Sequence, residues 1–193
     1  MAKDNIEIEI QVNVEKIKPL EEFLKKNAKF ESEDHQLDEY FSPAHKNFVA
    51  ERPVKEWLRL RDADGKCYIT YKNWHYTEKG EGTHADEFET ELKDVSAARK
   101  ILESLDCKPV VMVDKIRKTW RYKDYEIALD KVKGLDESVE VEYCGNMDGV
   151  DPQEKKKEMR DFLKEIGCGK LRSNKGGYAF LLLFPEEAEF KVH

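Results

Sequence analysis

The first strongly patterned stretch of the chain is Asn5–Val14. Isoleucine or valine occupies every second position, and the positions between them are polar. A period of two is typical of a β-strand with one apolar and one polar face. Two of the polar residues are Glu7 and Glu9, which such a strand places on the same side, about 7 Å apart. The pattern predicts a strand, and it leaves open whether the acidic face is a solvated sheet surface or the wall of a site.

Seven further strands and three helices are predicted by similar patterns. Alternating or apolar runs between turn residues predict strands over 30–41, 57–61, 66–73, 86–92, 109–122, 125–132 and 137–143. Apolar residues at helical spacing predict helices over 17–27, 95–105 and 151–166. The last of these begins with Asp151 and Pro152 and ends at Gly167. Residues 77–84 are expected to form a mobile loop, and residues 178–184 fit either a helical turn or a strand.

The order of these elements indicates an α+β fold. Strands follow one another mainly through turns and the helices are inserted singly, so we expect an antiparallel sheet. A sheet whose charged faces converge would close into an eight-stranded tunnel, or barrel, with a few flanking helices, and a closed sheet has no free edge. The length of 193 residues suits one domain, expected over 4–184, followed by a C-terminal tail at 185–193.

Composition and charge narrow the classes of function. The net charge of -7 argues against nonspecific nucleic-acid binding, which needs a basic surface. The N-terminus lacks the apolar core of a signal peptide, and the apolar run near residue 180 is too short to cross a membrane. We therefore expect a cytoplasmic protein, monomeric or homodimeric. The four cysteines are dispersed without a C-x-x-C pair, so we expect reduced thiols, mostly in the core.

Charged residues of the same sign recur two positions apart on the predicted strands. The acidic pairs are Glu7/Glu9, Glu87/Glu89 and Glu140/Glu142, and the basic pairs are Arg59/Arg61 and Lys115/Arg117. Solvated surfaces favour mixed signs, so this sorting indicates a cavity with an acidic wall and a basic wall. Such a cavity suits a polyphosphate and its metal ion, because guanidinium and ammonium groups bind phosphate oxygens and carboxylates bind Mg²⁺ or Mn²⁺. The sequence contains neither of the usual glycine-rich phosphate loops.

Simpler interpretations exist for several side chains. On any one strand taken alone, a solvated sheet face would explain the charges. We interpret His45 as a loop histidine, because no second His or Cys lies at metal-ligand spacing. We also interpret His84 as a loop residue, and contact with a substrate is the less favoured alternative. The three tryptophans are attributed to packing rather than base stacking. The basic run Lys155–Lys157 is attributed to a solvated helix face whose charge is offset by flanking acids.

The motifs occur in the order found in one known family. The segment Glu7–Gln11 resembles the E-x-E-x-K signature of the CYTH superfamily, which groups class IV adenylate cyclases with thiamine triphosphatases and is related to the triphosphate tunnel metalloenzymes. Further similarities are Asp38–Phe48 to the D-x-Y-[FY] strand and loop, Leu58–Arg61 to L-R-[IL]-R, Lys72 to the lysine ending the next strand, Lys115–Arg117 to K-x-R, Leu129–Leu135 to L-D-x-V-x-G-L and Glu140–Glu142 to E-x-E. The resemblance extends from about Asn5 to Phe184.

The resemblance implies an eight-stranded antiparallel tunnel that binds an organic or inorganic triphosphate together with Mg²⁺ or Mn²⁺. The metal ligands that it implies are Glu7, Glu9, Glu140 and Glu142. The implied catalytic residues are Arg59, Arg61, Lys72, Lys115, Arg117 and Asp130. The implied substrate-binding set contains the same five cations together with Gln11, Glu87 and Glu89.

Two departures from the family pattern bear on function. Gln11 stands where the signature has lysine, and Ala85, beside His84, stands where an arginine is expected. The resemblance implies conversion of ATP to cyclic AMP and pyrophosphate, as in class IV adenylate cyclases. Hydrolysis of thiamine triphosphate or inorganic tripolyphosphate is the alternative, and a non-catalytic triphosphate binder is a third hypothesis, supported by Gln11.

Overall fold

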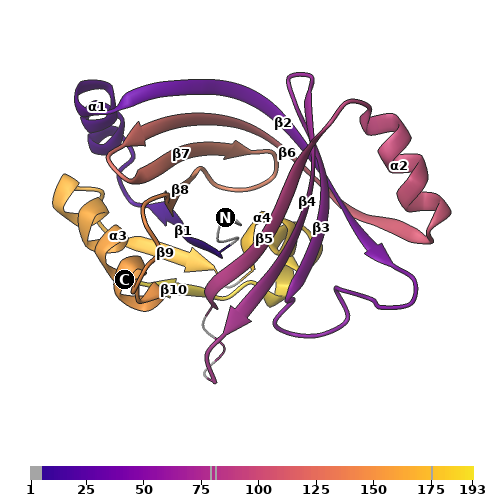
Figure 1. Ribbon diagram of the computed structural model, residues 1–193. Helices are drawn as coiled ribbons and strands as arrows, with labels where there is room; N and C mark the ends of the chain where they lie inside the picture. Colours follow the sequence, from indigo (N-terminus) through magenta and orange to yellow (C-terminus); the bar gives the residue numbers. More distant parts are fainter. Residues whose placement is uncertain (1–5, 79, 81, 175) are drawn as a thin grey trace.

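The computed structural model describes residues 6–78, 80, 82–174 and 176–193, and its central feature is a closed β-barrel (Figure 1). Within the described residues the barrel strands are β1 (Ile6–Val14), β2 (Lys29–Pro43), β3 (Glu56–Ala63), β4 (Lys66–Tyr76), β5 (Gly82–Leu92), β6 (Cys107–Tyr122), β7 (Tyr125–Val132) and β8 (Ser138–Tyr143). Their order is β1-β5-β4-β3-β2-β6-β7-β8, every pairing is antiparallel, and β8 pairs again with β1. The predicted α+β fold with an eight-stranded antiparallel tunnel is confirmed. Asn5 lies outside the described residues.

The described residues also form four α-helices around this barrel. Helices α1 (Lys18–Asn27) and α3 (Pro152–Ile166) lie together on one side, and α2 (Val95–Ser104) lies on the opposite side against β3 and β6 (Figure 1). The short helix α4 (Gly177–Leu183) packs against β6. The segment 178–184, for which the sequence fitted either a helical turn or a strand, is therefore mainly helical.

Two short strands extend the sheet near the C-terminus. Strand β9 (Leu171–Asn174) pairs with the end of β1, and β10 (Phe190–Val192) pairs with β9 after the 3₁₀ helix η1 (Pro185–Glu187). The segment expected as a tail therefore adds a strand to the sheet. The loop predicted over 77–84 is shorter than expected because β5 begins at Gly82, while Lys79 and Glu81 lie outside the described residues.

The apolar face of β1 points away from the barrel interior. Ile8 and Val12 are almost fully buried in a core that includes Leu24 of α1 and Leu163 of α3. Because successive side chains of a strand point to opposite faces, the glutamates between these residues face inward. The helices thus cover an outer apolar layer, and the interior of the barrel is left to polar side chains.

Helix α3 begins and ends where the sequence predicts. The Asp151 carboxylate accepts hydrogen bonds from the backbone N–H groups of Gln153 at 2.8 Å and Glu154 at 2.9 Å, and Pro152 follows at the first helical position. Gly167 ends the helix with a φ of 97°, a left-handed conformation that glycine adopts without strain. These signals fix the position of a 15-residue helix that packs against β1.

The cysteine prediction is correct in part. All four cysteines are free, but only Cys107 and Cys168 are buried, and Cys144 is exposed. His45 is exposed in the loop after β2, as expected. Among the described residues, the longest helices are too short and too polar to cross a membrane.

Truncating Leu163 to alanine is expected to lower the free energy of unfolding by about 2–5 kcal/mol, the usual cost of deleting a fully buried leucine side chain. Urea denaturation measures this loss. Leu105→Ala is the matched control, because Leu105 is 65% exposed at the end of α2 and its truncation should change stability by no more than about 0.5 kcal/mol. Equal losses in the two variants would contradict the assigned core.

Candidate active site

A cavity of about 390 Å³ lies inside the barrel. Twelve of the thirteen side chains proposed from the sequence line it, and Asp130 lies behind its surface. The twelve are Glu7, Glu9, Gln11, Arg59, Arg61, Lys72, Glu87, Glu89, Lys115, Arg117, Glu140 and Glu142. Residues far apart in the sequence meet here because every second residue of each barrel strand faces the interior.

The acidic side of the cavity is built by β1, β8 and β7. Glu9 pairs across the strands with Glu142, and Glu142 pairs on its other side with Glu126, which also lines the cavity and was not proposed from the sequence. Burial, together with repulsion by Glu9 and Glu126, raises the pKa of Glu142 to about 8. Within the described part of the chain, no cation lies within ion-pair distance of Glu142. The carboxylates here outnumber the cations that could neutralise them.

Lys72 of β4 connects this acidic side to β5. Its Nζ lies 2.6 Å from Glu7 Oε2, 2.9 Å from Glu87 Oε2 and 3.8 Å from Glu9 Oε1. Burial and repulsion by Glu9 raise the pKa of Glu7 well above its usual range. Burial opposes the charge of Lys72, but the carboxylates of Glu7 and Glu9 outweigh it and raise the pKa of the ammonium group. Three carboxylates therefore share one ammonium group.

Two arginines on the basic side are each held by an aspartate of the neighbouring strand. Arg61 of β3 pairs with Asp38 of β2, and its Nε and Nη2 donate to that carboxylate at 2.6 and 2.7 Å. Arg117 of β6 pairs with Asp130 of β7 through Nε and Nη2 at 2.8 and 2.6 Å. Such bidentate pairs fix the guanidinium planes. Asp130 thus holds the guanidinium group of Arg117 and does not itself line the cavity, and Asp38, missing from the proposed site residues, occupies the equivalent position beside Arg61.

Lys115 lies between these two aspartates. Its Nζ is 3.8 Å from Asp38 Oδ2 and 3.8 Å from Asp130 Oδ2, and it lies 5.2 Å from the centre of the Tyr178 ring. Burial and the neighbouring Arg117 lower the pKa of Lys115 to about 8. The hydroxyl of Tyr178 donates to Asp130 Oδ2 at 2.8 Å, so α4 helps to hold the same carboxylate.

Arg59 of β3 is held by side chains of β4 and β5. Its Nη2 donates to Thr70 Oγ1 at 3.0 Å and to Glu89 Oε2 at 3.3 Å, and the Thr70 hydroxyl donates to the same glutamate at 2.8 Å. The buried Nε of Arg59 has no hydrogen-bond partner among the described residues. Glu89 therefore supports Arg59 as Glu87 supports Lys72.

Gln11 occupies the position of the signature lysine and lies against Glu140. Its Nε2 donates to Glu140 Oε2 at 3.4 Å, and Asn174 Nδ2 donates to Gln11 Oε1 at 3.3 Å. Arg117 Nη1, 2.9 Å from Glu140 Oε1, is the cation that compensates this carboxylate. Burial would raise the pKa of Glu140, but Arg117 outweighs it and holds the pKa below its usual range.

The expectation that the basic run of α3 is a solvated face is wrong for Lys156. Its side chain is buried and lines the cavity, and Nζ donates to the Gly82 carbonyl at 3.0 Å and lies 5.3 Å from the centre of the Trp74 ring. Burial lowers the pKa of Lys156 to about 8. The sequence does hold a signal for this position, because Lys156 shares one helix face with the buried Met159 and Leu163 at spacings of three and seven.

Aromatic side chains form another part of the wall. Tyr40, Trp57 and Trp74 border the cavity, and the Tyr40 and Trp57 rings pack edge to face with their centres 5.4 Å apart. Trp120 lies in the outer core, where packing was expected. His84 does not line the cavity and stacks against His75 instead.

The acidic side fits a hard divalent cation. Its donors are carboxylate oxygens, the ligands that Mg²⁺ and Mn²⁺ prefer. The raised pKa values of Glu7 and Glu142 follow from carboxylates crowded together in a buried place, and a divalent ion would relieve that repulsion. The oxygens of the four glutamates are not gathered around one point. Among the described residues, the trio of ligating groups that lie within 4.8 Å of one another is His75, His84 and Asp86.

Comparisons with known proteins show the family and the fold. The model of the CYTH domain matches residues 5–178. A Methanocaldococcus jannaschii protein, named as a proposed adenylate cyclase, is 32% identical over 167 residues, covering 86% of this chain and 91% of that protein. A solved Pyrococcus horikoshii structure has a TM-score of 0.72 at 24% identity, over 92% of this chain and 99% of that one. A Hippeastrum structure, described as a proposed adenylyl cyclase with a dominant triphosphatase activity, has a TM-score of 0.61 at 20% identity, over 93% and 95% of the two chains.

The closed antiparallel barrel and the opposed charged walls define a β-tunnel protein with a charged interior. The chain belongs to the CYTH domain family, since the family model matches most of its length. The two solved structures are less than 25% identical to this chain and support the fold alone.

Replacing Lys156 with methionine is expected to change how stability depends on pH. A lysine whose pKa is about 8 in the folded protein and 10.5 in the unfolded chain binds fewer protons when folded between these values. Lys156 should therefore stabilise the wild type increasingly as the pH rises from about 8 to 10.5, and Lys156→Met should gain less stability over this range, the remaining gain coming from Lys115, whose pKa is also about 8.

Urea unfolding of both proteins across this pH range measures the difference. Lys157→Met is the control, because the exposed Lys157 should leave the pH dependence of the wild type unchanged. If Lys156→Met gained as much stability as the wild type between pH 8 and 10.5, the lowered pKa of Lys156 would be contradicted.

Proposed function

We propose that the protein is a divalent-metal-dependent enzyme that acts on an organic triphosphate, most like a class IV adenylate cyclase that converts ATP to cyclic AMP and pyrophosphate. The observation that supports this proposal most is that five cations from three strands face a carboxylate wall within one cavity. A triphosphate carries roughly four negative charges near neutral pH, which such a basic side matches.

The basic and the acidic walls would bind different parts of the metal–triphosphate complex. The basic side binds the phosphate oxygens through Arg59, Arg61, Lys72, Lys115 and Arg117. Asp38 and Asp130 position two of these guanidinium groups, and the bidentate pair of Arg61 uses Nε and Nη2, which leaves Nη1 for an anion. The metal ion, held by the four glutamates of β1 and β8, would supply Lewis-acid stabilisation of phosphate oxygens and of a developing alkoxide.

In the cyclase reaction the ribose 3′-hydroxyl gives its proton to water, and its oxygen attacks the α-phosphorus while the bond to the bridging oxygen of pyrophosphate breaks. Negative charge grows on the departing pyrophosphate. Preorganised, poorly solvated cations stabilise such charge more strongly than water does. The aromatic wall of Tyr40, Trp57 and Trp74 offers an apolar surface for a nucleobase.

Triphosphatase activity is the second candidate, and Gln11 favours it. Water would then attack the terminal phosphorus within the same cavity, and the bond to the bridging oxygen would break to release orthophosphate and a diphosphate. The cation missing at Gln11 would alter which phosphorus is best placed for attack. The Hippeastrum protein, whose described activity is dominated by triphosphatase, shares this fold.

Incubation with ATP and Mn²⁺ or Mg²⁺ tests the proposal. Cyclic AMP with pyrophosphate supports the cyclase, whereas ADP with orthophosphate supports the triphosphatase. Arg117→Met should lower turnover roughly 100-fold or more, the usual effect of removing a buried transition-state donor. Lys118→Met is the matched control, because this lysine follows on the same strand and pairs with Glu33 outside the cavity. No turnover with ATP, thiamine triphosphate or tripolyphosphate, combined with a ligand-dependent rise in melting temperature, would establish a non-catalytic binder.

Restoring the signature lysine with Gln11→Lys should raise kcat by about tenfold or more, since one charged hydrogen bond contributes about 1.5–3 kcal/mol. Steady-state kinetics with the substrate found above measures the gain. Asn13→Lys is the control: it adds the same charge two residues further along β1, beyond the cavity lining. Unchanged kcat in Gln11→Lys would show that the missing cation does not limit turnover.

A further inference from the structure

A β-bulge at the rim of the barrel brings unusual side chains together. Trp74 of β4 pairs with Ala85 of β5, and Tyr76 pairs with Gly82, so His75 alone faces two residues of β5. A bulge of this kind re-aims the side chains beside it. The two residues of β5 that lie opposite His75 are Thr83 and His84.

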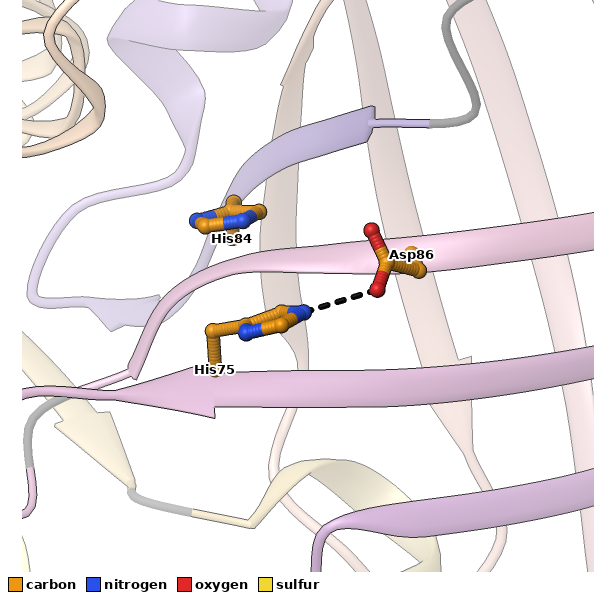
Figure 2. Close-up of side chains that lie close together, drawn as sticks. All are labelled: His75, His84 and Asp86. Atoms are coloured by element: carbon orange, nitrogen blue, oxygen red, sulfur yellow. Dashed lines mark hydrogen bonds and ion pairs between the residues drawn. The ribbon is translucent and has the colours of Figure 1, made fainter.

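The bulge places His84 beside His75, with Asp86 on the same face (Figure 2). His75 Nε2 lies 2.7 Å from Asp86 Oδ2, and the two imidazole rings stack with centres 4.5 Å apart and planes 8° from parallel. One ligating atom of each residue lies within 4.8 Å of the others, and no other trio of His, Cys, Asp or Glu in the described residues is gathered this closely.

This cluster lies on the outer face of the barrel wall. Lys72 and Trp74 on β4 and Glu87 on β5 line the cavity. His75 and Asp86 occupy the alternate positions, which point to the other side of the sheet. The cluster is therefore separate from the carboxylates proposed for the catalytic metal.

Hydrogen bonds leave one nitrogen of His84 suited to a metal. The Thr83 hydroxyl has one hydrogen, which it donates to the His75 carbonyl at 3.1 Å, so its oxygen accepts from Nδ1–H of His84 at 3.0 Å. Nε2 of His84 then carries the free lone pair that ligation requires. Neutral His75 can hold its proton on Nδ1 and present Nε2 next to Asp86.

We propose that His75, His84 and Asp86 form a Zn²⁺ site at the rim of the barrel. Two imidazoles and a carboxylate are typical zinc ligands, while Mg²⁺ prefers oxygen ligands and retained water. Ligating atoms in a tetrahedral zinc site lie about 3.3 Å apart. Side-chain rotation therefore has to close the separations, all within 4.8 Å, by at most about 1.5 Å, and to open the 2.7 Å between His75 Nε2 and Asp86 Oδ2 slightly. His75 and Asp86 are partly exposed, with side-chain exposures of 45% and 37%, and have room to rotate.

A bound ion would clamp β4 to β5 next to the cavity. Gly82, two residues before His84, accepts hydrogen bonds at its carbonyl from Lys156 at 3.0 Å and Gln153 at 3.5 Å, both on α3. The zinc site would thus fix the stretch of backbone that holds the cavity lysine of α3. This consequence is independent of which reaction the cavity supports.

Equilibrium dialysis of the tag-free full chain against Zn²⁺ in excess Mg²⁺, followed by metal analysis, tests the site. The wild type should bind one zinc ion. His75→Gln, His84→Gln and Asp86→Asn should each bind zinc roughly 100-fold or more weakly, because removing even a residue that only contacts a metal ligand lowers affinity about 10- to 100-fold. His35→Gln is the matched control. His35 Nε2 also lies 2.7 Å from a carboxylate, that of Asp114, but the described residues gather no third ligand there.

Zinc should also raise the melting temperature of the wild type and of His35→Gln but not of His84→Gln, since a ligand that binds only the folded state stabilises it. Urea unfolding checks that each variant folds, and three separate variants keep the test valid if one of them does not. Absence of bound zinc in the wild type would overturn the site, as would equal zinc binding by His84→Gln. Loss of zinc only in Cys144→Ser, which removes an exposed thiol, would also overturn it.

Discussion

The charged interior depends on a continuous chain of buried ion pairs across the strands β3, β2, β6 and β7. It runs from Arg61 through Asp38, Lys115 and Asp130 to Arg117, with every neighbouring pair of opposite charges within 4 Å. Each charge has given up water on burial, and only its neighbours compensate for that loss. Removing one member would leave the next charge buried and uncompensated, which costs more than the pair itself contributes. The wall that carries the cations therefore also fixes where they point.

This arrangement is possible because the barrel reverses the usual placement of polar and apolar side chains. The apolar face of β1 packs outward, where Leu24 of α1 and Leu163 of α3 cover it, and the acidic face turns inward. The hydrophobic core thus stabilises the fold from outside the tunnel. The interior is left free to hold charges that a conventional barrel core would exclude.

Much of this could be predicted from the sequence. The alternation of β1 predicted the strand, and the sign-sorted pairs predicted opposed walls. Both predictions depend only on the alternation of side chains between the two faces, which every β-strand has. Lys156 was missed because its charged neighbours in α3 suggested a solvated face, although its spacing to Met159 and Leu163 places it on the buried one. The bulge beside His84 leaves no periodic signal, since it arises from the register between two strands. Asp38 was missed as a positioning residue for a similar reason: its role exists only through its cross-strand partner.

The positions of Gln11 and Lys156 suggest how this chain can differ from the family signature. A lysine at position 11 would lie in the wall against Glu140, whereas Lys156 reaches the cavity from a covering helix, near enough to Glu7 and Glu9 for both carboxylates to favour its charged form. Its lowered pKa reflects burial without enough negative charge around it. Under the proposed function, a bound triphosphate supplies that charge and favours the ammonium form, so anion binding would be coupled to proton uptake near pH 8. Arg117 would show no such coupling, because its guanidinium group stays charged whether or not an anion is bound.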